Sequence, residues 1–183
     1  EDILNSKDFG VPQNRERIYI VAFRNDIAPK EFIFPTSTDS TKRIADIMEE
    51  KPVSSRYYLS DCYLETLRRH KARHEAKGHG FGYEVRSLDD VAGAIVCGGM
   101  GRERNLIVDK RQTDLTPVTH IKGEINKEGI RKMTPREWAR LQGFPDDYVL
   151  PLADVHLYKQ FGNSVTVPVI KAIAQKIRKV LEN

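Results

Sequence analysis

Cysteine is scarce in this sequence: the 183 residues include two, Cys62 and Cys97. Two isolated cysteines are too few for a disulfide framework or a zinc site, so we expect reduced thiols and no bound metal. The chain has no run of about 18 apolar residues, so no membrane span is predicted. It also lacks a signal-peptide pattern, internal repeats and long low-complexity tracts.

The balance of charged and apolar residues is that of a globular protein. Charged residues make up 31% and hydrophobic residues 39% of the chain, which suits one domain or two small lobes. The formal net charge is +4. This basic excess permits a nucleic-acid partner but does not require one.

The first part of the chain predicts two strands and two helices. Residues 17–23 are rich in β-branched and aromatic side chains, and residues 31–34 can form a second short strand. Helices are expected at 42–50 and 61–77. Thr41 can cap the first helix, whose core-facing side chains are Ile44, Ile47 and Met48. Ser60 can cap the second, whose core-facing side chains are Leu64 and Leu67.

The helix expected at 61–77 carries more basic than acidic side chains. A basic helix face is usually solvated surface, and the alternative is contact with DNA phosphates, which fix register without reading sequence. The basic residues are Arg68, Arg69, Lys71, Arg73 and Lys77. Of these, Arg68 and Arg69 are candidate DNA contacts.

Glycines gather between Gly78 and Gly101, among candidate strands at 81–86, 92–97 and 105–109. This texture predicts a β-rich region with many loops. Its most unusual stretch, Gly98–Arg104, can form a tight turn that displays Arg102 and Arg104. Arginine is the side chain that most often reads guanine in the major groove, whereas the plainer interpretation is a hairpin turn flanked by surface charges.

The segment Ile130–Pro145 predicts a short helix with firm ends. Trp138 and Leu141 lie three residues apart on one face of it, which is typical of a structural brace. The end signals are a cap, its capping-box partner, a proline in the first turn, a stop glycine and a proline beyond it: Thr134, Glu137, Pro135, Gly143 and Pro145.

The segment Tyr158–Pro168 predicts a loop that leads into a terminal amphipathic helix. Gly162, Asn163 and Ser164 are small and polar, so the backbone there can approach a ligand closely, or the triplet can be a helix cap. Pro168 is tolerable only in the first turn of the helix. The apolar stripe comprises Val169, Ile170, Ile173, Ile177, Val180 and Leu181.

These two segments, together with Asp8–Arg24, resemble three ordered blocks of the DNA (cytosine-5)-methyltransferases of bacterial restriction–modification systems. Asp8–Arg24 is similar to the family's Gln-x-Arg-x-Arg block, and Thr134–Pro145 and Gln160–Pro168 are similar to the last two blocks. The resemblance spans essentially the whole chain. One departure is Ala94–Ile95, where many members have Thr-Leu.

The resemblance implies a chemistry. Such enzymes flip a cytosine out of the duplex, a cysteine thiolate adds to C6, and C5 takes the methyl group of S-adenosylmethionine. By position, Arg17 would bond O2 of the flipped base, while Arg15 and Gln13 would shape the site. A guanidinium suits this task because it never deprotonates and donates in a rigid fork. Asn163 and Ser164 would lie beside the S-adenosylmethionine pocket.

The resemblance also implies a mixed α/β fold in three stretches. Residues 1–55 would end the catalytic domain and form a linker, 56–150 would form a small target-recognition lobe with its brace helix, and 151–183 would return to the catalytic domain. The first and last stretches would belong to a Rossmann-like, S-adenosylmethionine-dependent domain. A cytoplasmic, nucleoid-associated bacterial protein that acts on double-stranded DNA is therefore expected.

Several blocks of the family do not occur in this chain. Phe-x-Gly-x-Gly, Pro-Cys-Gln with its nucleophile, and Glu-Asn-Val are absent, and neither Cys62 nor Cys97 has the nucleophile's context. We therefore expect the chain to need an N-terminal catalytic domain or partner subunit, and to be inactive alone. The lack of an initial Met favours a fragment of one long chain over the second subunit of a split enzyme.

Two functions are compatible with the sequence: part of a cytosine methyltransferase, or a DNA-binding module without chemistry. The recognition sequence cannot be read from the residues. The terminal helix would lack its natural cover in the isolated chain, which predicts self-association or poor solubility.

Overall fold

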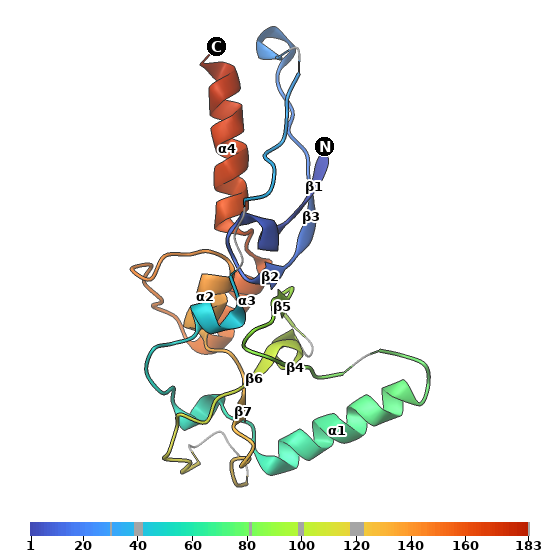
Figure 1. Ribbon diagram of the computed structural model, residues 1–183, viewed down its shortest axis with the longest axis vertical. Coiled ribbons are helices and arrows are strands. Elements are labelled where there is room, and N and C mark those ends of the chain that lie inside the picture. The colour runs from blue at the N-terminus through green and yellow to red at the C-terminus, as the bar shows by residue number, and fades with distance from the viewer. Residues whose placement is uncertain (30, 39–41, 81, 99–100, 118–122, 183) are drawn as a thin grey trace.

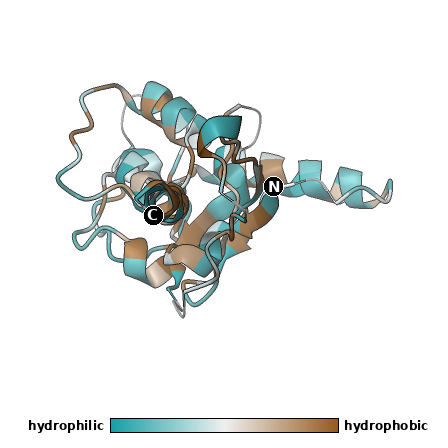
Figure 2. Ribbon diagram, turned by 90° about the horizontal axis from the view of Figure 1, so that it is seen from above, coloured by the Kyte–Doolittle hydropathy of each residue, from teal (hydrophilic) through white to brown (hydrophobic). Residues whose placement is uncertain are grey.

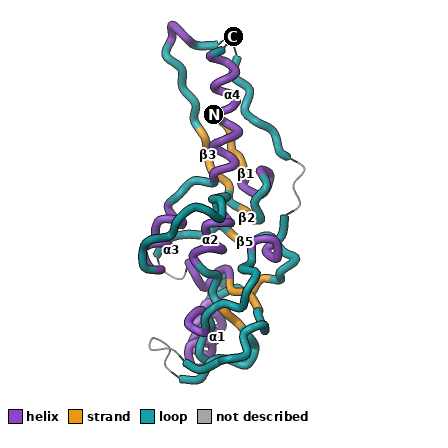
Figure 3. Tube along the Cα trace, turned by 90° about the vertical axis from the view of Figure 1, so that its left-hand side faces the viewer, coloured by secondary structure: helices purple, strands orange, loops and turns teal. Residues whose placement is uncertain are grey.

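The computed structural model describes residues 1–29, 31–38, 42–80, 82–98, 101–117 and 123–182. The chain is drawn out along one axis, with small sheets and helices at its two ends and a helical centre between them (Figures 1 and 3). Both termini lie at the same end (Figure 1). Within the described ranges, no helix is long and apolar enough to cross a membrane.

The end that holds both termini is built from a two-stranded sheet and the last helix. Strands β1 (Asp2–Asn5) and β3 (Glu16–Tyr19) pair antiparallel, with Leu4 opposite Arg17. Helix α4 (Val167–Leu181) packs on the turn between these strands. The shared core comprises Leu4, Phe9, Val169 and Ile173.

Two sequence predictions fail at this end. The strand expected at 17–23 stops at Tyr19, and residues 31–34 form extended loop instead of a strand. Aromatic packing holds that loop, because the Phe32 ring lies 5.5 Å from Phe23 and 5.1 Å from Phe34. The β-forming composition there reflects ring packing and not strand pairing.

The terminal helix forms as predicted, with Pro168 in its first turn, but its stripe is only partly covered. Val169 and Ile173 are buried and Ile177 and Val180 are half-buried. Ile170 and Leu181 are exposed.

The centre of the molecule holds the main apolar core. Helices α2 (Pro135–Leu141) and α3 (Asp154–Asn163) pack against each other, and the short strands β2 (Gln13–Asn14) and β5 (Ala92–Gly93) pair parallel beside them. The core includes Ile44, Ile95, Trp138, Leu141, Leu157, Tyr158 and Phe161. The firm helix ends at α2 are confirmed: Thr134 and Glu137 form the capping box, and Gly143 has φ of 76°.

Two further predictions are corrected in the centre. The helix expected at 42–50 is a single 3-10 turn, Ile44–Ile47, and its expected cap Thr41 lies outside the described residues. Ile44 and Ile47 are nevertheless buried, as the pattern indicated. The loop expected before Ser164 is instead the end of α3, because Gly162 and Asn163 continue that helix.

The other end is a three-stranded sheet with a projecting helix. Strand β6 (Leu106–Val108) pairs parallel with β4 (Val85–Arg86) and antiparallel with β7 (Ile130–Arg131). Helix α1 (Asp61–Glu75) extends outward from this sheet and is largely hydrophilic (Figures 1 and 2). Ser60 caps α1, and Leu64 and Leu67 face the core, as predicted.

The strands expected at 81–86, 92–97 and 105–109 exist but are shorter, at Val85–Arg86, Ala92–Gly93 and Leu106–Val108. Residue 81 lies outside the described residues. The expected mixed α/β class, with small sheets and few helices, is confirmed.

Candidate functional site

Gln13 lies at the junction between the two halves of the fold. Its side chain is fully buried. The Nε2 atom donates to the carbonyl of Leu141 at 2.9 Å and to Gln142 Oε1 at 3.3 Å, and Oε1 accepts from the backbone N–H of Ile95 at 3.0 Å. One amide thus ties β2 to the end of α2 and to Ile95, which follows β5 in the chain.

Arg15 reinforces the same junction. Its Nη1 atom donates to the Ile95 carbonyl at 2.6 Å, and Nη2 donates to the carbonyls of Ser164 at 3.2 Å and Gly162 at 3.3 Å. Burial, and then the like charge of Arg17, lower its pKa from the ordinary arginine value. Both backbone polar groups of Ile95 are therefore held by Gln13 and Arg15, although Ala94–Ile95 departs from the family pattern.

Arg17 differs from its two neighbours in the block because it is exposed. It lies on β3, and among the described residues its Nη1 atom donates only to the adjacent Glu16 carbonyl, at 2.6 Å. Gln13 and Arg15 are thus committed to internal hydrogen bonds, whereas the Arg17 guanidinium faces outward and can reach a ligand.

Asn163 is the last residue of α3 and lies beside Cys97, and Ser164 follows it in the chain. Cys97 Sγ donates to Asn163 Oδ1 at 2.9 Å, and Ser164 Oγ donates to the Phe161 carbonyl at 2.9 Å. A cavity of about 620 Å³ opens here, lined by Leu152, His156, Lys159, Gln160, Asn163 and Ser164. Its amide, hydroxyl and basic groups can bind a polar ligand with a carboxylate.

The predicted turn Gly98–Arg104 is described only in part, because residues 99–100 lie outside the described ranges. Its second half is the 3-10 helix η5 (Gly101–Asn105), in which inward and outward residues alternate. Glu103 is buried and accepts from Lys132 at 3.1 Å and from Tyr63 at 3.2 Å. Burial and then Glu103 raise the pKa of Tyr63 to about 12, so its hydroxyl stays a donor.

Asn105 is the second anchor of η5. Its Oδ1 accepts from the Gly93 N–H at 2.8 Å, and its Nδ2 donates to the Gly93 carbonyl at 3.1 Å. Arg102 and Arg104 point away from these anchors, half-buried and exposed respectively. Arg104 is thus exposed as the sequence predicted, Arg102 is only partly so, and contact of either with DNA stays a prediction.

Arg68 and Arg69 lie far from these groups, on the projecting helix α1 (Figure 1). Arg68 is paired with Glu128 on the surface. Arg69 is exposed on the face opposite Leu64. The structure therefore does not bring these two arginines together with Arg17 or Arg102, and they form a separate basic surface.

A buried ion network was missed by the sequence interpretation. Arg131, on β7, donates to Glu137 on α2 at 2.7 and 2.8 Å and to Asp109 at 3.0 Å. Both residues of β7 are buried, so strand alternation gave no signal for this network. This network fixes α2 to the three-stranded sheet of β4, β6 and β7.

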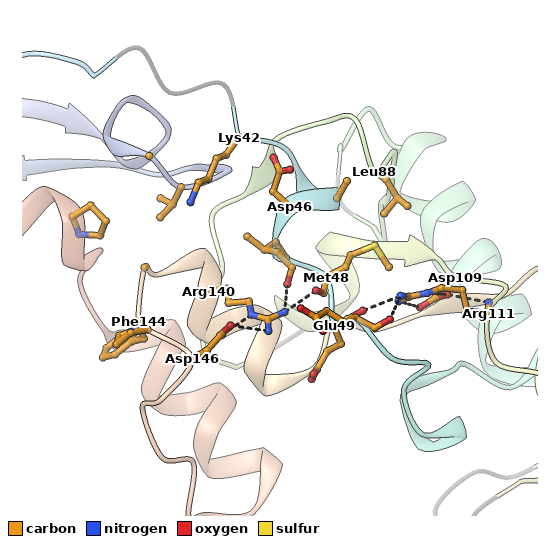
Figure 4. Close-up of a pocket in the computed structure, with 18 of the residues that line it drawn as sticks. Lys42, Asp46, Met48, Glu49, Leu88, Asp109, Arg111, Arg140, Phe144 and Asp146 are labelled. Carbon is orange, nitrogen blue, oxygen red and sulfur yellow. Dashed lines mark hydrogen bonds and ion pairs between the residues drawn. The ribbon is translucent and has the colours of Figure 1, made fainter.

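A larger cavity of about 870 Å³ lies between the 3-10 turn Ile44–Ile47 and the loop after α2 (Figure 4). Its arginines are committed to internal partners. Arg140 donates to the Met48 carbonyl at 2.7 Å and to Asp146, and Arg111 donates to the Glu49 carbonyl at 2.8 Å and to Asp109. This cavity therefore has a structural lining and no free cationic group from these two side chains.

Comparison with known proteins identifies the family. The family model of the C-5 cytosine-specific DNA methylases matches residues 1–179. The chain belongs to this family. The C-5 cytosine-specific methylase chain is 62% identical over 181 residues to the type II methyltransferase M.HpaII of Haemophilus parainfluenzae, covering 99% of this chain and 51% of the relative. It is 41% identical to M.SsoII of Shigella sonnei, covering all of this chain and 45% of that protein.

Solved structures show the same fold. The Dnmt2 methyltransferase of S. pombe matches this methylase chain with a TM-score of 0.63 at 20% identity, over all of this chain and 57% of that one. The methyltransferase EhMeth of Entamoeba histolytica matches with a TM-score of 0.61 at 16% identity, over 98% of this chain and 52% of that one. The methylase chain thus spans about half the length of the curated relatives it matches.

Proposed function

We propose that this chain is the target-recognition and base-contact part of a DNA (cytosine-5)-methyltransferase that acts on double-stranded DNA in a bacterial cell. The observation that carries the proposal is the contrast within one block. Gln13 and Arg15 are buried in the junction, while Arg17, two residues along, presents its guanidinium at the surface. A rigid, permanently charged donor at such a place suits the O2 atom of an extruded cytosine.

The division of labour follows from what this chain contains. It supplies Arg17 for the base, and Arg102 and Arg104 for the major groove, but it has no Pro-Cys-Gln nucleophile. An N-terminal half of the same protein, or a partner subunit, supplies the thiolate. This requirement agrees with relatives about twice as long as this chain.

S-adenosylmethionine is the cofactor that this half-site suits. When bound, it supplies the methyl group. Asn163 and Ser164 hold its polar end, because both side chains border the cavity beside α3 and offer amide and hydroxyl groups. The bond from Cys97 to Asn163 orients that amide.

Exposed apolar side chains at the end of the molecule that holds both termini indicate where the N-terminal half packs. Ile3, Ile18 and Ile20 are 62%, 65% and 74% exposed on and beside the β1–β3 sheet, and Ile170 is exposed on α4. Burial of such side chains stabilises an interface by roughly 25 cal/mol per Å². Arg17 lies on the same strand as Ile18, so a half that packs on this sheet adjoins the strand that carries the base-contact residue.

Reconstitution tests the proposal. The isolated chain should transfer no labelled methyl group to bulk DNA, and mixing it with an N-terminal half that carries Pro-Cys-Gln should restore transfer. In the complete enzyme, Arg17→Ala should lower kcat on the order of 100-fold with little change in DNA affinity. Arg24→Ala, an exposed arginine paired with Asp26, is the matched control and should leave kcat unchanged. Turnover by the isolated chain, or full activity of Arg17→Ala, would contradict the proposal.

The second candidate function is a DNA-binding module without chemistry. The displayed arginines of η5 and the basic surface of α1 favour it. Sequence-selective, salt-dependent binding by the isolated chain, without activity on reconstitution, would support this alternative.

A further inference from the structure

Arg102 and Arg104 are both displayed by η5, but their surroundings differ. The Arg102 guanidinium carbon lies 5.5 Å from the centre of the Tyr158 ring, over its face. Among the described residues, Arg102 has no hydrogen bond or ion pair with a protein group, so its N–H donors are not consumed. Arg104 is exposed and has no such aromatic support. One arginine is therefore held in place and the other is free to move.

The Tyr158 ring is itself fixed at its edge and at its tip. It is buried, and it meets the Trp138 ring edge-on at 4.8 Å and 76°. Its hydroxyl donates to the Met133 carbonyl at 2.6 Å. Burial raises the Tyr158 pKa above its ordinary value, so the hydroxyl keeps its proton. The ring therefore cannot follow a moving guanidinium and acts as a rigid platform.

A cation–π contact suits the reading of a base. It attracts the guanidinium to the ring face through the ring's quadrupole and leaves the N–H fork available. A bidentate pair with guanine needs both N–H groups in one plane, and a guanidinium already held there loses less conformational entropy on binding. Anchoring of η5 by Glu103 and Asn105 fixes the backbone from which Arg102 extends.

We propose that Tyr158 is a positioning residue for sequence recognition, which holds the Arg102 guanidinium ready to pair with a guanine of the target. The inference rests on the proposed methyltransferase function. Tyr158 and the cofactor residue Asn163 belong to the same helix, α3. The platform therefore connects the reading arginine with the helix that ends at the cofactor half-site.

The test uses the complete enzyme. Its target is first found by bisulfite sequencing of DNA from a host that expresses it, and kcat/KM is then measured on duplexes with the target and with each single base-pair change. Four variants are compared with the unaltered enzyme: Arg102→Ala, Tyr158→Leu, Tyr158→Phe and the double variant Arg102→Ala with Tyr158→Leu. Phe161→Leu is the matched control, because Phe161 is a buried aromatic residue of α3 that packs on Phe144.

Arg102→Ala should reduce discrimination at one G·C pair on the order of 10- to 100-fold. Tyr158→Leu should reduce discrimination at the same base pair by a smaller factor. Tyr158→Phe, which keeps the ring, should discriminate as well as the unaltered enzyme. The double variant should discriminate no worse than Arg102→Ala, since Tyr158 acts through Arg102. Phe161→Leu should lower the melting temperature without changing the ratio of kcat/KM between the target duplex and the altered duplexes.

The outcomes separate the two proposals. If the unaltered enzyme methylates no DNA, the proposed function fails. If it methylates a specific sequence and Tyr158→Leu keeps full discrimination, or loses it equally at every base pair, the role of Tyr158 is refuted while the function stands. Additive losses in the double variant would also refute it.

Discussion

Arg131 and Glu137 form a two-pronged ion pair with both side chains fully shielded from solvent, at 2.7 and 2.8 Å. Glu137 also accepts the backbone N–H of Thr134 at 2.8 Å and that of Glu49 at 3.2 Å. Burial alone would lower the Arg131 pKa, but the hydrogen bonds and charge of Glu137 raise it above its ordinary value. One carboxylate thus caps α2 and neutralises Arg131 of β7.

Removal of Arg131 should strongly destabilise the chain. Arg131→Met leaves Glu137 buried without its cation and Asp109 with Arg111 alone, and the loss of one partner of a buried pair costs about 3–5 kcal/mol. Arg24→Met is the control, because its pair with Asp26 is exposed and such pairs contribute about 0–1 kcal/mol. Urea unfolding followed by the fluorescence of Trp138, the single tryptophan, measures both. Equal free energies of unfolding for the two variants would contradict the assignment.

Gly162 brings α3 into close contact with the backbone of Val96 and Cys97. A Cβ atom at this position would lie 2.6 Å from the backbone nitrogen of Cys97, which is too close. Gly162→Ala should therefore destabilise the chain by about 1–3 kcal/mol, as overpacking does. Gly80→Ala, where nothing lies within 4 Å of the added carbon, should change the free energy of unfolding by less than about 0.5 kcal/mol. Calorimetry of the two variants compares them directly.

Asp109 should make stability depend on acid pH. Hydrogen bonds from Arg111, followed by those and the charge of Arg131, lower its pKa below the ordinary value, despite the opposing effect of burial. A carboxyl whose folded pKa is lowered contributes stability that is complete above its unfolded pKa, about 3.9, and is lost as pH falls through the folded pKa. The unaltered chain should lose more stability below that pH than Asp109→Asn does. Parallel pH profiles of the two proteins would exclude Asp109 as the source.

The isolated chain should self-associate through the surface that the N-terminal half would cover. Ile18 lies on β3 and Ile20 just beyond its end, and both are strongly exposed. Changing both to Lys should convert a concentration-dependent dimer or aggregate to a monomer in light scattering, because it removes the apolar patch. Ile27→Lys, at a separate exposed isoleucine, should not. A monodisperse monomer before any substitution would overturn the prediction.

Arg69 should contribute to DNA affinity without affecting selectivity, because it is an exposed side chain of α1 and not one of the two η5 arginines proposed to contact bases. Arg69→Ala in the complete enzyme should weaken binding similarly on target and non-target duplexes and reduce the slope of log affinity against log salt by about 1. Arg68→Ala should do less, since Arg68 is already paired with Glu128. An unchanged salt slope for Arg69→Ala would assign α1 to plain solvated surface.

The local elements with strong end signals were predictable from the sequence, and those set by distant partners were not. The capping box of Thr134 and Glu137 and the left-handed Gly143 depend on neighbours within a few residues, so the pattern determines them. The prediction of a strand at 31–34 was wrong because a strand needs a hydrogen-bonded partner strand from elsewhere in the chain. The Phe32 ring packs against the rings of Phe23 and Phe34 instead.

The candidate site shows the same division. The Gln-x-Arg-x-Arg block was found from sequence, but nothing in its spacing says that Gln13 and Arg15 turn inward to Ile95 while Arg17 faces outward. Those partners lie about 80 residues away in the chain. The contact of the Tyr158 ring with Arg102 could not be predicted from the sequence either, because the two residues lie far apart in the chain.

In η5, the residues that hold the backbone and the residues on display alternate: Glu103 and Asn105 face the interior, and Arg102 and Arg104 face outward. Among the described residues the two sets share no hydrogen bond, so exchange of Arg102 or Arg104 leaves the anchors Glu103 and Asn105 intact, although Arg102 would lose its contact with the Tyr158 ring. Under the proposed recognition role, exchange of Arg102 or Arg104 would change the target sequence while the scaffold of η5 stays the same.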